Sequence, residues 1–180
     1  MNRSTILSTS PTSQQGTVLV VSLLVLLVMT ILALSASQAT RMQERMAGAT
    51  RDMDVAFQAS EAGLRNSEEM LDQLSVQPDP CSSPGCQVYQ IDVLPADLRY
   101  LDKNWWDSHG RIFMEGEDNL DIVHEQPQAV VEELAFVPDS LTVGQGAPTG
   151  KTYYRVTSRG FGATDKAESV LQSTYTRRFQ

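Results

Sequence analysis

Two cysteines are the residues with the clearest potential for chemistry in this chain of 180 residues. Cys81 and Cys86 stand in the segment CSSPGC, where Pro84 and Gly85 favour a tight turn that could close into a disulfide. The chain-entropy model gives so small a loop about 2 kcal/mol of stabilisation. A zinc site would need two further ligands at suitable spacing, and none lies nearby in the sequence. Two free thiols in a reducing compartment are the alternative, and the disulfide is favoured because an apolar N-terminal segment points to export of the chain beyond it.

The other side chains that often hold metals or perform catalysis form no recognisable active-site pattern. His109 and His124 have no ligand spacing to each other or to the cysteines, so we expect both on the surface. The acidic segment EGEDNLD at 115–121 lacks the alternate spacing and bidentate glutamate of an EF-hand, and we expect a solvated turn. The sequence contains no phosphate-binding loop, dinucleotide fingerprint or nucleophile elbow. It therefore predicts a protein that is not an enzyme, with no catalytic, cofactor-binding or metal-binding residues.

The strongest pattern in the chain is a charge-free, apolar segment near the N-terminus. No charged residue lies between Arg3 and Arg41, and the centre of this gap reads TVLVVSLLVLLVMTILALSA from Thr17. A helix of about twenty residues rises about 30 Å, enough to cross a bilayer core. We expect a polar leader over 1–16 and a transmembrane helix over 17–39. Cleavage after the apolar run, as in a secretory signal, is disfavoured because the run is longer than usual and the chain continues beyond it as helix.

Charge bears on the orientation of the chain and on its partners. The net charge is −8, and the thirteen Lys and Arg against twenty-two Asp and Glu from Arg41 onward give −9. No basic patch with interleaved aromatic residues is present, so we expect no nucleic acid to be bound directly. Arg41, Arg45 and Arg51 come after the span, and a count of positive charge alone would place the C-terminal part in the cytoplasm. The disulfide-ready turn and the absence of a cytosolic motif favour the outside instead.

Beyond the span, apolar or small residues recur mostly every three, four or seven positions, which is the spacing of one helix face. The stripe consists of Met42, Met46, Ala49, Met53, Phe57, Ser60, Leu64, Leu71 and Leu74. We expect an amphipathic extension over 40–76, ended by Pro78 and Pro80. From Thr17 to Leu74 such a helix is about 85 Å long, whereas a hundred-residue domain has a radius of gyration of about 13 Å. The membrane or neighbouring subunits must cover the rest, although a stalk that holds a domain off the bilayer would use the same residues.

The remaining part of the chain, 77–180, changes to the short alternating pattern of strands, and we expect it to form a head domain. The expected strands lie at 87–94, 111–117, 129–137, 151–160 and 168–179. The last two are joined by the turn-forming GATDK and predict an antiparallel hairpin. A long helix followed by several strands predicts the α+β fold class, with the helix packed on an antiparallel sheet. Trp105 and Trp106 are expected to plug one edge of the core, with ligand binding as the alternative.

Three segments of the chain together resemble the type IV pilus minor pilins of the PilX type. They read QQGTVLVVSLLVLLVMT around Gly16, ERMAGATRDMDVAFQASEAGLRNSEE from Glu44, and YYRVTSRGFG with VLQSTYTRR from Tyr153. The run AFQASEAGLR is the most specific, because amphipathicity alone does not require it. The resemblance implies the lollipop-shaped pilin fold, in which a long N-terminal helix carries a head domain with a C-terminal sheet.

The resemblance also implies how the chain is processed and what it does. A prepilin peptidase would remove the leader after Gly16, and the new terminus at Thr17 would be N-methylated. The mature chain would prime type IV pilus assembly with other minor pilins, the major pilin, a tip adhesin and the inner-membrane assembly platform. Twitching motility, surface attachment and DNA uptake would depend on it. It would span the inner membrane once, with its head in the periplasm, and then enter the surface pilus near the tip. The helix residues implied for the filament core are Val21, Met42, Met46, Met53, Phe57 and Leu64.

The chain departs from the major pilins at the start of the helix. Major pilins carry Phe where this chain has Thr17, Glu where it has Val21, and basic residues where it has Gln14 and Gln15. The glutamate of major pilins pairs with the terminal amine of a neighbouring subunit, so a subunit without it suits the filament tip. Two alternatives use the same residues. One is a type II secretion pseudopilin at the pseudopilus tip, and the other is a stalk-anchored periplasmic binding module with its ligand site at the paired tryptophans.

Overall fold

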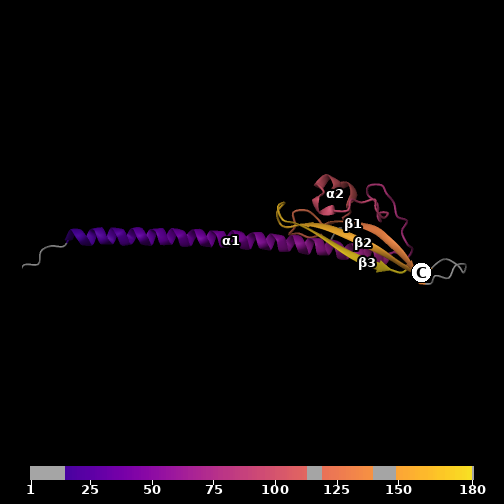
Figure 1. Cartoon of the computed structure of the whole chain (residues 1–180), viewed down its shortest axis with the longest axis horizontal. Helices are drawn as coiled ribbons and strands as arrows, with labels where there is room; N and C mark the ends of the chain where they lie inside the picture. Colours follow the sequence, from indigo (N-terminus) through magenta and orange to yellow (C-terminus); the bar gives the residue numbers. More distant parts are fainter. Residues whose placement is uncertain (1–14, 113–118, 140–148, 180) are drawn as a thin grey trace, which may run out of the picture. The chain divides into compact units, whose positions relative to one another are not determined.

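The computed structural model describes residues 15–112, 119–139 and 149–179. The chain forms two compact units, Met1–Ala47 and Gly48–Gln180. One α-helix, α1 (Gln15–Gln73), continues from the first unit into the second (Figure 1). It is the one element described in the first unit, whereas in the second its last turns join a sheet and two short helices.

In the first unit, α1 is largely apolar, and its described side chains are exposed because no other described element packs on them. Its most apolar window of 18 residues has a mean hydropathy of 3.0, and among the described residues α1 is the one helix long and apolar enough to cross a membrane. No proline interrupts it, and a helix satisfies its own backbone N–H and C=O groups where no water can. The hydroxyls of Ser22, Thr30 and Ser35 donate to carbonyl oxygens three or four residues earlier. These side chains therefore add no unpaired donor to the apolar surface.

The second unit is built on a three-stranded antiparallel sheet in the order β1-β2-β3. Its strands are β1 (Gln128–Pro138), β2 (Gly150–Phe161) and β3 (Glu168–Arg177). β2 and β3 pair in continuous register down to Phe161 opposite Glu168, beside the GATDK turn. The predicted C-terminal hairpin and the predicted strand at 129–137 are confirmed.

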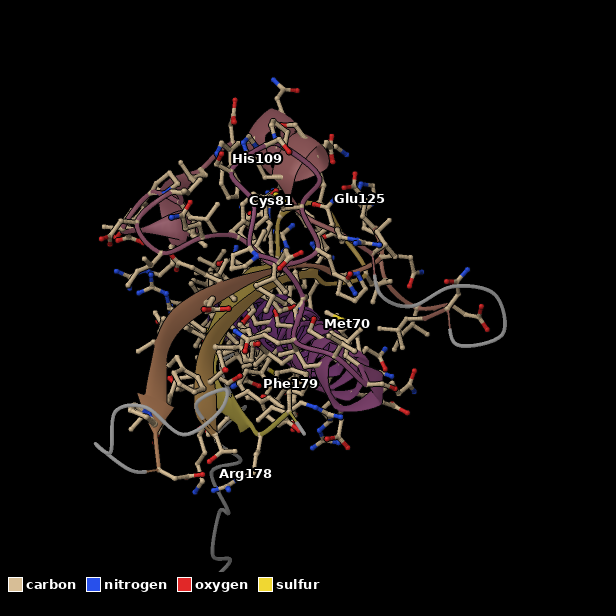
Figure 2. The ribbon with its side chains drawn as sticks, turned by 90° about the vertical axis from the view of Figure 1, so that its right-hand side faces the viewer. Met70, Cys81, His109, Glu125, Arg178 and Phe179 are labelled. Atoms are coloured by element: carbon tan, nitrogen blue, oxygen red, sulfur yellow. A yellow bond between two sulfur atoms is a disulfide. The ribbon has the colours of Figure 1, made fainter. Side chains whose placement is uncertain are left out.

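Side chains of the central strand β2 alternate between two buried faces. Tyr154 and Val156 face α1, in an inner cluster with Leu71. Arg159 points to the other face, where its guanidinium lies 5.8 Å from the ring centroid of Trp106. Viewed along the long axis, the sheet lies between the end of α1 and a layer that holds α2 (Lys103–His109), whose last residue is labelled (Figure 2). This arrangement confirms the α+β class, with the helix packed on an antiparallel sheet.

The predicted strand at 87–94 is wrong. Only Tyr89 pairs in this segment, through isolated bridges to Cys81 and to Glu132 of β1. The segment cannot continue alongside β1, because Asp92 takes a positive φ of 62° and the chain turns away. Apolar residues that predict a strand here are instead buried in two clusters, Val88 in the inner cluster with Leu71, and Tyr89 and Leu94 in the cluster around Trp106.

A short helix, α2, occupies a segment for which the sequence predicts no element. The carboxylate of Asp102 caps it by accepting from the backbone N–H of Trp105 at 3.1 Å. A second short turn, the 3-10 helix η1 (Leu98–Tyr100), precedes it. After α2, Arg111 forms an isolated bridge with Ala129. The rest of the strand predicted there, from residue 113 on, lies outside the described residues.

Candidate functional site on the long helix

Small side chains line the face of α1 that meets the sheet in the second unit. The buried ones are Ala56, Ala59, Ser60, Gly63 and Ser67. A Cβ added to Gly160 of β2 would lie 2.4 Å from the backbone nitrogen of Ser60 and 2.8 Å from the carbonyl oxygen of Ala56. The helix backbone and the strand backbone therefore approach each other directly, with no side chain between them. This contact explains why the segment AFQASEAGLR is rich in alanine, serine and glycine.

The sequence carries a signal for this contact that the apolar stripe obscures. Ser158, Gly160 and Gly162 recur at every second position, so they lie on one face of an extended chain. The small residues of α1 recur every three or four positions from Ala56 to Ser67, so they lie on one face of a helix. Two faces of small residues, one helical and one extended, together predict close helix–strand packing.

Hydrogen bonds flank the close contact and hold α1 along β3. The carboxylate of Asp52 accepts from the hydroxyl of Thr164 and from its backbone N–H. The hydrogen bond from the Thr164 hydroxyl is the main reason that the pKa of Asp52 lies below its ordinary value, and the hydrogen bond from the Thr164 backbone N–H lowers it further. The other pairs are Ser60 with the Ser169 carbonyl, Ser173 with Glu68, Tyr175 with Asp72, and Arg177 with Asp72. Alternate residues of β3 thus face the helix, and polar contacts accompany the small-residue packing along the second unit.

The residues predicted for a filament core do not share one environment. The exposed ones are Val21, Met42, Met46, Met53 and Phe57. Their exposed fractions run from 49% for Phe57 to 65% for Met42. Leu64 differs, because it is half-buried and packs against the inner cluster of its own unit. Gly16 and Thr17, at the predicted cleavage point, lie in the first turn of α1 and are exposed.

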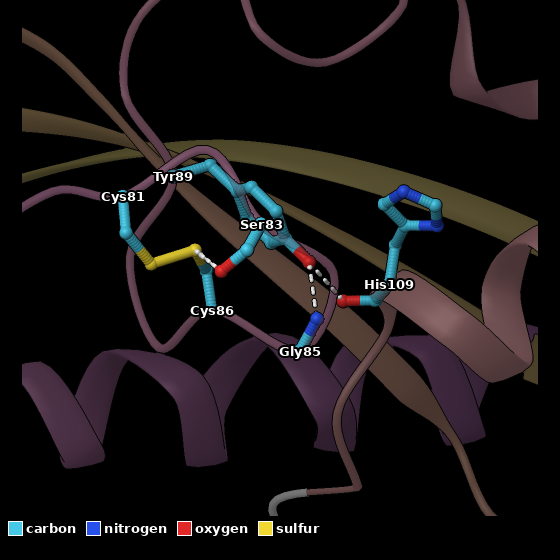
Figure 3. The surroundings of a disulfide bond; sticks show 6 residues. All are labelled: Cys81, Ser83, Gly85, Cys86, Tyr89 and His109. Carbon is cyan, nitrogen blue, oxygen red and sulfur yellow. Dashed lines mark hydrogen bonds between the residues drawn. A yellow bond between two sulfur atoms is a disulfide. The ribbon is translucent and has the colours of Figure 1, made fainter.

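Cys81 and Cys86 form the predicted disulfide, with their Cα atoms 6.0 Å apart (Figure 3). The turn that they close is tied to Tyr89, whose hydroxyl accepts from the N–H of Gly85 at 3.1 Å and donates to the carbonyl of His109 at 2.8 Å. Burial of Tyr89 raises its pKa above the ordinary value. The backbone of Tyr89 also hydrogen-bonds to β1. The disulfide turn is therefore part of the packed domain.

The two tryptophans do not share an exposed site. Trp106 is fully buried, and half-buried Trp105 stacks on the ring of His109 with the centroids 4.5 Å apart. This placement is the predicted one at the edge of the core. The stack also half-buries His109, which the sequence places on the surface, whereas His124 is exposed as predicted. Among the described residues, no group of three or more His, Cys, Asp or Glu side chains could hold a metal ion, and residues 115–118 of the acidic segment lie outside them.

A long N-terminal helix that is apolar at its start, and whose end packs on an antiparallel sheet, defines the class of membrane-anchored, pilin-like subunits. The PilX N-terminal family matches residues 15–65, and the type IV pilus assembly protein PilX C-terminal family matches residues 52–177. Because the second match covers more than half of the chain, this protein belongs to the PilX family of type IV pilus assembly proteins. No curated protein and no solved structure matches the chain. The family is one of structural assembly proteins, and the role of the chain is that of a pilus-related minor pilin.

Proposed function

We propose that this chain is a minor pilin that helps to prime assembly of the type IV pilus, together with other minor pilins and a tip adhesin. The uncovered apolar helix of the first unit carries the proposal. Large apolar side chains are exposed along it from Val18 to Leu34. Apolar surface of this extent requires a cover, because water is an unfavourable neighbour for it. The bilayer supplies the cover before assembly, and the helices of neighbouring subunits supply it in the filament.

Processing is the first step of the proposed pathway. A prepilin peptidase removes the leader, 1–16, by cutting after Gly16, and Thr17 becomes the methylated N-terminus. The mature chain then has a transmembrane helix at 17–39, an amphipathic extension at 40–76 and a periplasmic head at 77–180. The PilX family match, which begins at residue 15, supports a mature chain that starts close to this point.

The proposed position is the tip of the pilus, with roles in twitching motility and surface attachment. Val21 supports it, because a valine side chain can neither accept a hydrogen bond nor pair with the terminal amine of another subunit. A subunit without this acceptor has no need of a neighbour above it. Later subunits can still be added on its membrane side, where their long helices would pack against its long helix.

Two measurements test this function. The intact mass of the chain from membranes or pili should show loss of residues 1–16 and one added methyl group, and an intact leader would contradict the processing step. Gly16→Leu should block cleavage, whereas Gly48→Ala, farther along the same helix, should leave it unchanged. Deletion of the gene should leave few or no surface pili. Normal piliation would contradict the role.

The type II secretion pseudopilin is the second candidate, and it is favoured by the same Val21, since the tip pseudopilin resembles this chain in lacking the glutamate. Deletion would then abolish protein secretion and leave pili intact. The stalk-anchored binding module is less well supported, because the full burial of Trp106 removes half of the ligand site that it requires.

A further inference from the structure

Six of the eight arginines of the second unit form ion pairs with carboxylates among the described residues. The pairs are Arg65–Glu61, Arg99–Asp97, Arg155–Glu132, Arg159–Glu168, Arg177–Asp72 and Arg178–Asp139. Arg41 and Arg45 of the first unit are different. Both are exposed, and within the described part of the chain neither has a carboxylate partner. Among the described residues these two cations, like Arg51 farther along the same helix, therefore lack the ion pairs that most arginines of the second unit form.

Arg41 and Arg45 stand one helical turn apart, and two exposed methionines flank them at the same spacing. Met42 and Met46 are 65% and 64% exposed, so most of each side chain faces solvent. The four residues Arg41, Met42, Arg45 and Met46 are named the Arg41–Met46 face. It combines fixed positive charge with flexible, polarisable apolar side chains, a composition suited to docking a partner helix.

Positive charge at this position works against the proposed orientation. The proposed function places the Arg41–Met46 face on the periplasmic side, within about fifteen to twenty residues of the span, where Lys and Arg disfavour translocation. After export the two exposed arginines are hydrated and available to a carboxylate-bearing partner.

We infer that the Arg41–Met46 face docks against the acidic segment of the long helix of another pilin subunit, which lies parallel to α1 and nearer the membrane. The inference rests on the proposed function and names the partner for part of the same helix. Subunits inserted in one orientation have parallel helices. In register, arginines would face arginines, which is repulsive. A stagger is therefore required.

The charge order along this chain shows which stagger is favourable. Residues 41–51 contain three arginines and one glutamate, whereas residues 52–72 contain six carboxylates and one arginine. We take a partner helix with the same order of charges as this chain. When that helix is displaced toward the membrane by nine residues, or about 14 Å, its residue equivalent to Asp54 lies beside Arg45. A subunit added from below would occupy this position. The favourable stagger therefore agrees with a place at the tip.

Anionic lipid is a weaker partner for these arginines. Arg45 lies six residues beyond the proposed end of the span at residue 39, a rise of about 9 Å or about one Debye length at physiological salt, so the composition of the face rather than its distance decides the partner. Segments that bind acidic lipids also contain about four to eight clustered basic residues, and this face contains two. A helix segment rich in carboxylates matches the positive charge of this face.

A photo-crosslinker placed at Met46 in cells that assemble pili tests the partner directly. The expected product joins Met46 to the acidic helix segment of another pilin subunit, identified by peptide mass spectrometry. The same crosslinker at Ala47, which lies about 100° around the helix from Met46, should reach that segment much less. Crosslinks to phospholipid alone, to pilin heads alone, or to no subunit would overturn the inference.

A charge-reversed variant tests the role of the arginines themselves. Arg41→Glu with Arg45→Glu should lower the crosslink from Met46 on the order of tenfold, because the attraction between this face and the acidic segment becomes repulsion, and should reduce the number of surface pili. Arg41→Lys with Arg45→Lys keeps the charge and should retain most of both. The reversed variant should insert normally, since it carries less positive charge on the exported side.

The outcomes separate this inference from the proposed function. If the charge-reversed variant gives wild-type pili and crosslinks, or if the lysine variant fails as well, the charge pairing is wrong. The minor pilin role is then tested separately, by whether deletion of the gene removes surface pili. Thermal unfolding of the head should be the same in all variants, because neither arginine forms an ion pair with it in the described structure.

Discussion

Gly160→Ala is the sharpest test of the contact between α1 and the sheet. The added Cβ would lie 2.4 Å from the Ser60 nitrogen and 2.8 Å from the Ala56 oxygen, and real Cβ contacts are essentially never this short. Both atoms belong to the helix backbone, so no rotamer change can relieve the overlap. The helix must move away from β2 or the strand must bend.

The expected cost is the sum of three contributions. Overpacking a tight site costs about 1–3 kcal/mol, and the upper part of this range applies because backbone must move. Separation of α1 from the sheet also weakens the hydrogen bond from Ser60 to the Ser169 carbonyl, which contributes about 1 kcal/mol. Alanine in a strand gains about 0.5–1 kcal/mol over glycine. The free energy of unfolding should therefore fall by about 2–3 kcal/mol.

Thermal unfolding of the full mature chain in detergent micelles measures this change. Trp106 is fully buried in the second unit, so tryptophan fluorescence reports its unfolding. A domain of this size loses roughly 4 °C in melting temperature for each kcal/mol, so Gly160→Ala should lower it by about 10 °C. Gly48→Ala is the matched control, because nothing lies within 4 Å of its added Cβ. It should leave the melting temperature unchanged or raise it slightly. An unchanged melting temperature for Gly160→Ala would refute the direct backbone contact.

Three further predictions concern the second unit. Replacing Cys81 and Cys86 with serine should lower the free energy of unfolding by about 2 kcal/mol in denaturant titrations, and the unfolded, unreduced wild type should not react with a thiol reagent. Burial raises the pKa of Tyr154 from 10.0 to about 12, so the unfolded state releases this proton first. Stability should therefore decrease as the pH rises from about 10 toward 12, and Tyr154→Phe should reduce that slope in urea unfolding, with the raised pKa of Tyr89 accounting for part of the remainder. Because the pKa of Asp52 is lowered by Thr164, its contribution is present above the ordinary carboxyl pKa and is lost as the pH falls through the folded value. Asp52→Ala should abolish this acid-side loss and speed hydrogen exchange of the Thr164 amide. If the variant loses stability at acid pH as the wild type does, Asp52 is not the group responsible.

Periodicity predicts the elements that local sequence controls. The helix of α1 is explained by an apolar run with no proline and a continuing helical spacing, and the β2–β3 hairpin by alternation around GATDK. The stripe of apolar residues is a less reliable guide to burial. It groups Met53 and Phe57, which are exposed, with Ser60 and Leu71, which are buried.

The parts that could not be predicted depend on contacts between distant residues. Arg159 is 6% exposed, pairs with Glu168 and lies 4.6 Å from the ring centroid of Phe161, yet an arginine in an alternating strand is ordinarily expected outside. The turn at Asp92 reflects packing of Tyr89 against β1, for which the segment itself has no signal. The same limit applies to the candidate site, since Met42 and Met46 are exposed in this chain and their proposed contacts lie in other subunits.

The hydrogen bonds between α1 and the C-terminal strand also set an order of events in the life of the chain. Asp52 and Thr164 are 112 residues apart, and Glu68 and Ser173 are 105 residues apart. Contacts this distant form late, because the intervening chain must first be ordered. The helix is made early and β3 is the last described element, so the hydrogen bonds between them form only after the intervening chain has been made. A chain truncated before β3 would therefore keep the contact between α1 and β2 but lose the β3 residues whose hydrogen bonds hold α1 along the sheet.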